Sequence, residues 1–209
     1  MLKRTLPLFF LLAITITAGS CIFDPKDTGG DDPAPARPFL DRTEQWHVIN
    51  NIELAYNRRL IEPYRNLLDE SFTFFLSPGD VGGTVPDSWG RDIEVQANEN
   101  LFVQDPPGDL PPCKNIRMNI QWEKDPASSK PEPDPVLLSW IRLDNSGANS
   151  DETWFTTTVF YDFDIRVDIP NTEEDLTYQT NNGAKAQFTV RQDVDGKWKL
   201  VEFRDLGAE

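Results

Sequence analysis

Hydrophobic residues recur at helical spacing in three segments of the first half of the chain. The first segment is RTEQWHVINNIELAYNRR, residues 42–59, where one face is marked by Trp46, Ile49, Ile52 and Tyr56. The second is IEPYRNLLDE, residues 61–70, in which Pro63 suits the first turn of a short helix. The third begins near Trp89 and is predicted to turn inward Trp89, Ile93, Ala97 and Leu101.

The second half of the chain changes to strand periodicity. In NIRMNIQW, residues 115–122, every second residue is apolar, and long alternating runs follow at 153–167, 184–193 and 197–205. The last two runs flank Asp195-Gly196, a pair typical of a hairpin turn. Shorter apolar runs at 71–77 and 135–143 add further strands. The pattern predicts an α+β domain with three N-terminal helices packed on a strongly curved antiparallel sheet.

Two stretches resemble the nuclear-transport-factor-two-like superfamily, which includes ketosteroid isomerase and polyketide cyclases. IELAYNRRLIEPYRNLLDESFTF is similar to the opening helix pair and first strand of that superfamily, and GKWKLVEFRDL is similar to its last strand. The resemblance covers roughly residues 39–206 and implies a cone-shaped, cystatin-like fold, often with an apolar pocket. Enzymes of the isomerase type carry a carboxylate near the end of the first strand, where this chain has Leu76 or Ser77. We therefore carry over no catalytic residue.

The N-terminus has the parts of a lipoprotein export signal. Residues 1–20 contain Lys3 and Arg4, a short apolar run and a small-residue exit, which is the organisation of a secretory signal peptide. Ala18-Gly19-Ser20-Cys21 resembles the lipobox of bacterial lipoproteins, which implies cleavage between Ser20 and Cys21 and acylation of Cys21 by palmitate-like chains. The alternative is an ordinary secretory signal or a retained anchor. Ile22 is not the Asp linked to inner-membrane retention, so outer-membrane sorting is compatible with the sequence.

The organisation after the signal is simple. Residues 21–38 are rich in Asp, Gly and Pro and are predicted to form a flexible linker behind the lipidated cysteine. Residues 39–209 suffice for a single domain with one core. The export signal and the lipidated cysteine predict that the protein lies in the bacterial cell envelope, outside the cytoplasm, and is anchored to a membrane by its lipid.

Charge excludes one class of partner. Without Lys3 and Arg4, the 20 basic residues fall to 18 against 35 acidic ones, a formal charge of −17. So acidic a chain is not expected to bind nucleic acid. Cys113 is interpreted as a partly buried structural thiol, because the only histidine, His47, is far away in sequence.

Polar motifs give no catalytic or metal site. His47 is interpreted as a surface or boundary residue of the first helix. The stretch 191–202 fits a calcium-loop spacing except that Arg191 occupies the first ligand position, so we expect neither a metal nor a cofactor. Asp162 and Asp164 share one strand face and are interpreted as a solvated acidic patch.

Aromatic residues supply the remaining candidates. Most of the six tryptophans are expected in the core, and we predict that Tyr56, Met118 and Trp122 lie close to any cavity. Three hypotheses follow. The first is a non-catalytic lipoprotein that binds a small apolar ligand or a protein partner. The second is a membrane-tethered isomerase, dehydratase or hydrolase that uses a pocket carboxylate. The third is an assembly module, for example a homodimer paired through the sheet.

Overall fold

The computed structural model describes residues 37–81, 86–103, 106, 108, 111–121, 139–143, 153–168, 175–180 and 184–207. Cleavage at Ser20, acylation of Cys21, residues 21–36 of the predicted linker and the pocket candidate Trp122 lie outside these residues.

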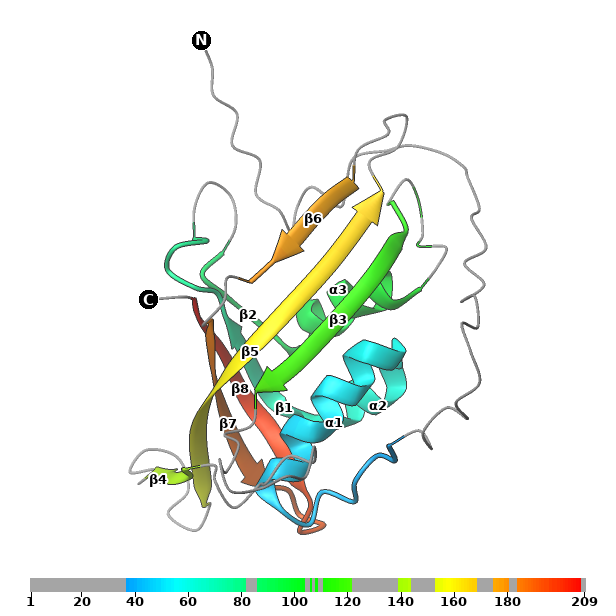
Figure 1. Cartoon of the computed structure of the whole chain (residues 1–209). Helices are drawn as coiled ribbons and strands as arrows, with labels where there is room; N and C mark the ends of the chain where they lie inside the picture. The colour runs from blue at the N-terminus through cyan, green and yellow to red at the C-terminus, as the bar shows by residue number, and fades with distance from the viewer. Residues whose placement is uncertain are drawn as a thin grey trace, which may run out of the picture.

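Three helices lie on one side of a curved sheet (Figure 1). They are α1 (Gln45–Arg58), α2 (Ile61–Leu67) and α3 (Arg91–Phe102). A capping box formed by Glu44 and His47 begins α1, and Arg59 ends it in the left-handed conformation, with φ 54°. The next helix therefore starts after only two residues and folds back against α1.

Eight strands form one sheet. They are β1 (Leu68–Phe75), β2 (Ser88–Gly90), β3 (Cys113–Gln121), β4 (Ile141–Leu143), β5 (Trp154–Asp168), β6 (Asp175–Gln179), β7 (Lys185–Gln192) and β8 (Trp198–Gly207). The main order is β2-β1-β8-β7-β5-β3, while β4 and β6 pair with β5. The predicted α+β architecture, three helices on a curved sheet, is confirmed. The sheet is antiparallel at every described pairing but one, since β1 runs parallel to β8. The two strands are far apart in sequence, so no short hairpin dictates their relative direction.

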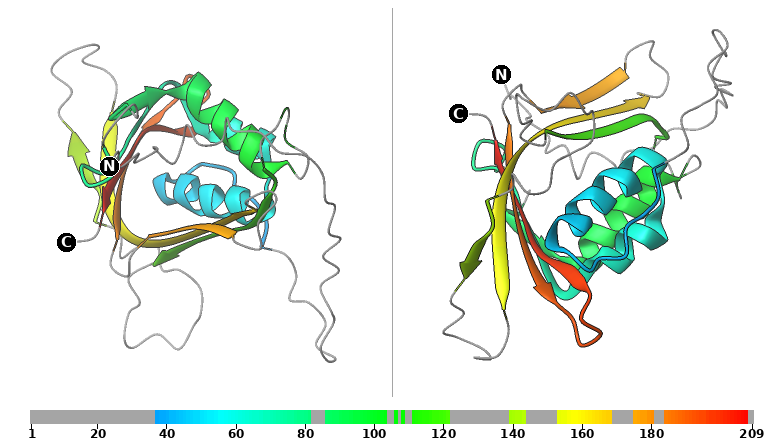
Figure 2. Two further views of the ribbon diagram at one scale, coloured as in Figure 1. Left: turned by 90° about the horizontal axis from the view of Figure 1, so that it is seen from above. Right: turned by 60° about the horizontal axis from the view of Figure 1, so that its bottom comes forward.

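The curvature comes from the long strand β5. Its first half pairs with β7 and β4, whereas its second half pairs with β3 and β6. The sheet seen from one end curls around α1, and α3 lies across the opening (left view of Figure 2). We call the part made of β3, β6 and residues 160–168 the wing.

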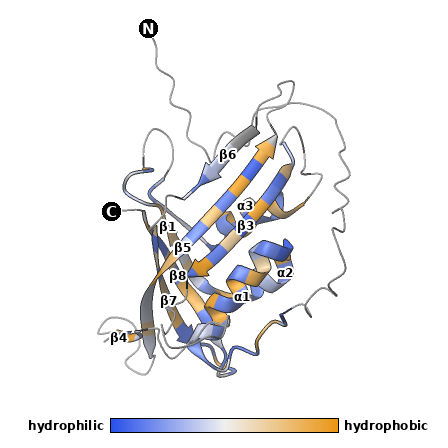
Figure 3. Ribbon diagram, in the orientation of Figure 1, coloured by the Kyte–Doolittle hydropathy of each residue, from blue (hydrophilic) through white to orange (hydrophobic). Residues whose placement is uncertain are grey.

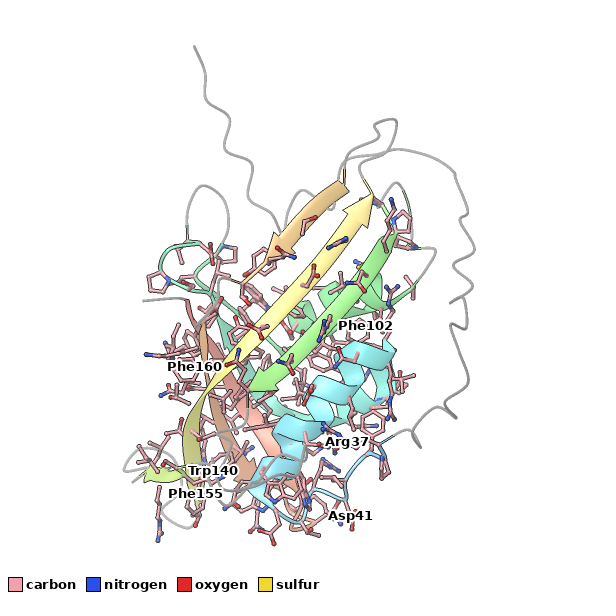
Figure 4. All side chains as sticks on the ribbon, in the orientation of Figure 1. Arg37, Asp41, Phe102, Trp140, Phe155 and Phe160 are labelled. Atoms are coloured by element: carbon pink, nitrogen blue, oxygen red, sulfur yellow. The ribbon has the colours of Figure 1, made fainter. Side chains whose placement is uncertain are left out.

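The inner face of the sheet supplies the core. Ile116, Met118 and Ile120 alternate on β3, and Val159, Tyr161 and Ile165 alternate on β5; all are at most 9% exposed. Figure 3 shows the matching alternation of polar and apolar positions along both strands. In Figure 4, Phe102 lies on the helix side of the molecule, whereas Phe160 lies on the outer side of β5. Phe102 is buried and Phe160 is 42% exposed.

The third helix is rotated relative to its sequence prediction. Its buried residues are Glu94, Val95, Asn98 and Phe102. Ile93, which we predicted to face inward, is 61% exposed. The prediction was wrong because it assigned polar side chains to the surface, whereas Glu94 and Asn98 are buried among hydrogen-bond partners.

The free edge of β3 is closed by the end of α1. The Asn57 side chain donates to the Met118 carbonyl at 2.7 Å and accepts from the Met118 amide at 2.8 Å, as a neighbouring strand would. The Arg59 guanidinium donates to the carbonyls of Cys113 and Lys114, both at 2.8 Å. One helix terminus thus satisfies backbone groups along the strand that would otherwise be unpaired.

Candidate functional site

A buried carboxylate, Glu94, joins the three helices and the short strand β2. It is 3% exposed and accepts hydrogen bonds from the Tyr64 hydroxyl and the Trp89 indole, each at 2.6 Å. The Asn98 amide donates to it at 2.8 Å from the next turn of α3. Burial raises the pKa of Glu94, although the hydrogen bonds from these groups oppose the rise. The carboxylate has no cationic partner among these contacts, so its negative charge is balanced by dipoles alone.

The Tyr64 hydroxyl extends this network to α1. It accepts a hydrogen bond from the Tyr56 hydroxyl at 3.4 Å. Both tyrosines are at most 5% exposed, and burial together with the negative charge of Glu94 raises the pKa of each. Both hydroxyl groups therefore keep their protons and act as hydrogen-bond donors.

A second buried carboxylate, Asp205, lies on the last strand. It is 5% exposed, accepts from the Gly207 amide at 2.9 Å and is hydrogen-bonded by the Tyr161 hydroxyl. Burial raises the pKa of Asp205, helped by the negative charge of Asp80. A carboxyl group with a raised pKa can retain its proton nearer to neutral pH than an exposed one, and such groups are candidates for binding or proton transfer.

Asp205 lies near the end of β1, where isomerases of the resembling superfamily carry their catalytic carboxylate. Leu76 and Ser77 occupy that position and are 8% and 6% exposed. A Cβ atom placed on Gly207, two residues beyond Asp205, would come within 2.7 Å of the Ser77 hydroxyl oxygen. The carboxyl group near this part of the interior is therefore supplied by the end of β8, which sequence reasoning did not single out.

Aromatic rings connect the helices to the inner face of the wing. Tyr56 makes edge-to-face contacts with Phe102 and with Phe163, each with ring centroids 5.2 Å apart, and Phe163 makes another with Tyr178 at 6.3 Å. Phe163 and Tyr178 are only partly buried. We call Tyr56, Phe163 and Tyr178 the inner aromatic wall.

The structure brings two of the three predicted pocket residues to this wall. Tyr56 belongs to it, and Met118 on β3 stands directly opposite Phe163 on β5. Trp122, the third, lies outside the described residues. Phe163 was not proposed from the sequence, although it lies on the apolar face of the alternating run 153–167.

A third buried carboxylate is paired with a cation. Arg191 binds both oxygens of Asp69, with Nε and a terminal guanidinium nitrogen each at 2.9 Å. Burial alone would raise the pKa of Asp69, but hydrogen bonds from Arg191 and Ser71 hold it below its usual value. Asp69 is only 5% exposed, and its partner comes from a strand more than one hundred residues later in the sequence.

The remaining polar candidates have structural environments. The Cys113 thiol is buried beside the carbonyls of Asn115 and Arg166, and burial raises its pKa, so its environment does not favour the thiolate. His47 accepts from the Glu44 amide at 3.4 Å as part of the helix cap. The calcium-like stretch folds as a β-hairpin in which the Asp193 carboxylate accepts from the amides of Asp195 and Lys197. No cluster of metal-binding side chains occurs among the described residues.

Comparison with known proteins returns structures only. No family model and no curated protein matches the chain. A structure from Novosphingobium aromaticivorans provisionally named as an aromatic ring hydroxylase is 12% identical, with a TM-score of 0.44, over 83% of this chain and 92% of that one. A nuclear transport factor 2 (NTF2-like) superfamily protein from Salmonella enterica is 8% identical, with a TM-score of 0.43, over 78% and 87%.

A third similar structure, provisionally named as a scytalone dehydratase and also from N. aromaticivorans, is 13% identical, with a TM-score of 0.41, over 77% and 78% of the two chains. Each of these three structures is similar to most of this chain, at 13% identity or less. None of the helices in the described part of the chain has the length and hydropathy needed to span a bilayer.

Proposed function

We propose that this protein is a lipid-anchored, extracytoplasmic module whose interior binds a small apolar ligand at the inner aromatic wall. The observation that carries the proposal is the partial exposure of Phe163 and Tyr178 on the inner side of the wing, in contact with Tyr56. Partly exposed aromatic rings beside a few oriented polar groups are typical of small-molecule sites. Asp205 and Tyr161 would supply the polar groups.

The non-catalytic reading is supported by the state of Glu94. Its oxygens already accept three short hydrogen bonds from the protein's own side chains. A catalytic base must reach a proton on the substrate, and Glu94 is enclosed by residues that are at most 7% exposed. We therefore assign Glu94 to structure and the partly exposed aromatic rings to binding.

The binding proposal is tested by native mass spectrometry of the chain purified from the envelope fraction of its own host. A reproducible excess mass that is lost on denaturation is expected. Phe163→Ala should abolish that mass, whereas Phe160→Ala should retain it, because Phe160 lies on the same strand with its side chain on the outer face. A bare chain, or equal loss in both variants, would contradict the proposal.

The anchor is tested separately. In a bacterial host fed an alkyne analogue of palmitate, the wild-type chain should become labelled and remain with membranes, whereas Cys21→Ser should do neither. Labelling of the Cys21→Ser variant would contradict acylation at this position.

A second function is favoured by one observation, the raised pKa of Asp205 beside the Tyr161 hydroxyl. In this case the protein would be a tethered isomerase, dehydratase or hydrolase, with Asp205 transferring the proton. Asp205→Asn would then abolish turnover of the molecule identified by mass spectrometry without preventing its binding. Binding without turnover by the wild-type chain would exclude this function.

A further inference from the structure

The outer face of the wing carries a pocket that shares one residue, Phe163, with the inner aromatic wall. Its volume is about 280 Å³, and it is lined by Arg117, Asn119, Asp162, Phe163, Asp164, Gln179 and Thr180. We call it the wing pocket. Pockets for drug-sized ligands occupy roughly 300–1,000 Å³, so this one is suited to a single small ring.

Three strands bring the polar groups of the wing pocket together. Asp164 on β5 stands opposite Arg117 on β3 and opposite Gln179 on β6. Two residue pairs along, Asp162 stands opposite Asn119. The arrangement depends on β6, which pairs with the second half of β5, beyond the residues that pair with β7.

One acceptor in the pocket lacks a donor. Oδ1 of Asp164 is buried and has no hydrogen-bond partner; the nearest cationic nitrogen, Nε of Arg166, lies 3.8 Å away, beyond hydrogen-bonding range. Asp162, by comparison, accepts from Asn119 at 3.2 Å and from Gln121 at 3.0 Å. Buried polar atoms are almost always hydrogen-bonded, so an unpaired acceptor in a pocket indicates a place for a donor from a ligand.

The pocket also offers donors. The Thr180 hydroxyl oxygen accepts from the Phe163 amide at 2.8 Å, which leaves its own hydrogen free to point elsewhere. Gln179 is exposed and carries both a donor and an acceptor, and Arg117 adds a guanidinium. The pocket is therefore lined by both hydrogen-bond donors and hydrogen-bond acceptors.

The charges around the pocket cancel. Asp162 and Asp164 contribute two negative charges, and Arg117 and Arg166 contribute two positive ones. A metal cation or a phosphate would require an excess of one sign, whereas a hydroxyl group donates and accepts at once and requires neither. We propose that the wing pocket binds a neutral polyhydroxylated ring, that is, a sugar or cyclitol unit, independently of the inner site.

The test is saturation-transfer difference NMR on the full chain in a detergent without a sugar headgroup. The probes are glucose, N-acetylglucosamine and myo-inositol, with cyclohexanol as a ring of similar size that has one hydroxyl group. At least one polyol should show saturable transfer, and cyclohexanol should not. Asp164→Ala and Gln179→Ala should each weaken binding by about tenfold or more, as expected for loss of a hydrogen bond involving a charged or polar pair.

The matched control is Glu202→Gln on β8. Glu202 is an acidic residue with an arginine neighbour, Arg204 at 3.6 Å, but it does not line the pocket. This variant should bind the polyol as the wild type does. Gln179 is exposed, so its replacement tests the site without endangering the fold. The proposal is overturned if no polyol binds, if cyclohexanol binds equally well, or if both pocket variants bind like the wild type.

Discussion

Glu94 and Asp205 are both buried, both hydrogen-bonded by a tyrosine and both have a raised pKa, yet their surroundings differ. Glu94 is held by side chains from α2, β2 and α3, and the hydroxyl of Tyr56 on α1 completes the network. Asp205 has one tyrosine and a backbone amide of its own strand. The Glu94 carboxylate accepts three hydrogen bonds from side chains of three elements. The Asp205 carboxyl group accepts two, which leaves about half of its four acceptor sites unused.

The difference separates a structural carboxylate from one available for function. A carboxylate with several protein donors stabilises the arrangement of those donors, and its removal leaves all of them without an acceptor. One with few donors can accept or release a proton, or bind a ligand, at smaller cost to the fold. Stability and ligand binding should therefore respond to the two residues in opposite ways.

The largest effect is expected for Glu94→Ala. Its loss leaves the Tyr64 hydroxyl, the Trp89 indole and the Asn98 amide buried without their acceptor, at about 1–3 kcal/mol each. We expect the free energy of unfolding to fall by about 4 kcal/mol or more in urea titrations, and Glu94→Gln to lose about half as much because it keeps the shape and one acceptor. A loss below about 1 kcal/mol for the alanine variant would show that Glu94 does not hold these elements together.

Arg191→Met should follow closely, with a loss of about 3 kcal/mol, because it leaves Asp69 buried without its cation. The double variant Arg191→Met, Asp69→Leu should recover part of that stability, since it also removes the buried, unpaired negative charge of Asp69. If the double variant is no more stable than Arg191→Met, the ion pair is not the cause of the loss.

Asp205→Asn should change the free energy of unfolding by only about 1 kcal/mol, because the amide oxygen can still accept from the Gly207 amide. The same variant should alter the binding of the ligand identified in the envelope fraction. Equal destabilisation by Asp205→Asn and Glu94→Gln in parallel urea titrations would remove the contrast between the two carboxyl groups.

The pH dependence gives the smallest effect but distinguishes the carboxylates by sign. The folded-state pKa of Glu94 lies above its unfolded value, so the folded state binds more protons and this group's contribution to stability falls as pH rises from the unfolded pKa through the folded one. The pKa of Asp69 is lowered, so its contribution is present above the unfolded pKa and is lost as pH falls through the folded pKa. Between pH 4.5 and 8, Glu94→Gln should therefore flatten the decline in stability measured for the wild type. An unchanged slope would mean that Glu94 does not titrate differently in the folded state.

Periodicity predicted the elements better than it predicted the buried polar groups. The alternating face of Ile116, Met118 and Ile120 and the hairpin at Asp195-Gly196 were correct, because apolar burial and turn chemistry are local signals. Strand β6 was missed because it is short and pairs only with the second half of β5.

The candidate site depended on partners that no local pattern reveals. Asp69 finds Arg191 at a sequence separation of 122, and Glu94 finds Tyr64 at a separation of 30. One signal was available for Glu94: Asn98 follows it at a spacing of four residues, which brings a carboxylate and an amide together on one helix face. Reading α3 by hydrophobicity alone placed Ile93 inward instead.

The side-chain amide of Asn57 on α1 covers part of the edge of β3, and this affects how the protein behaves before α1 has docked. Asn57 occupies both backbone groups of Met118, at which a strand from another molecule could attach, so this part of the edge cannot easily bind a neighbour while α1 is in place. While the chain folds, this edge is closed only when α1 docks. Loss of Asn57 should therefore appear first as precipitation and poor recovery of the protein, before any change in what the folded molecule binds.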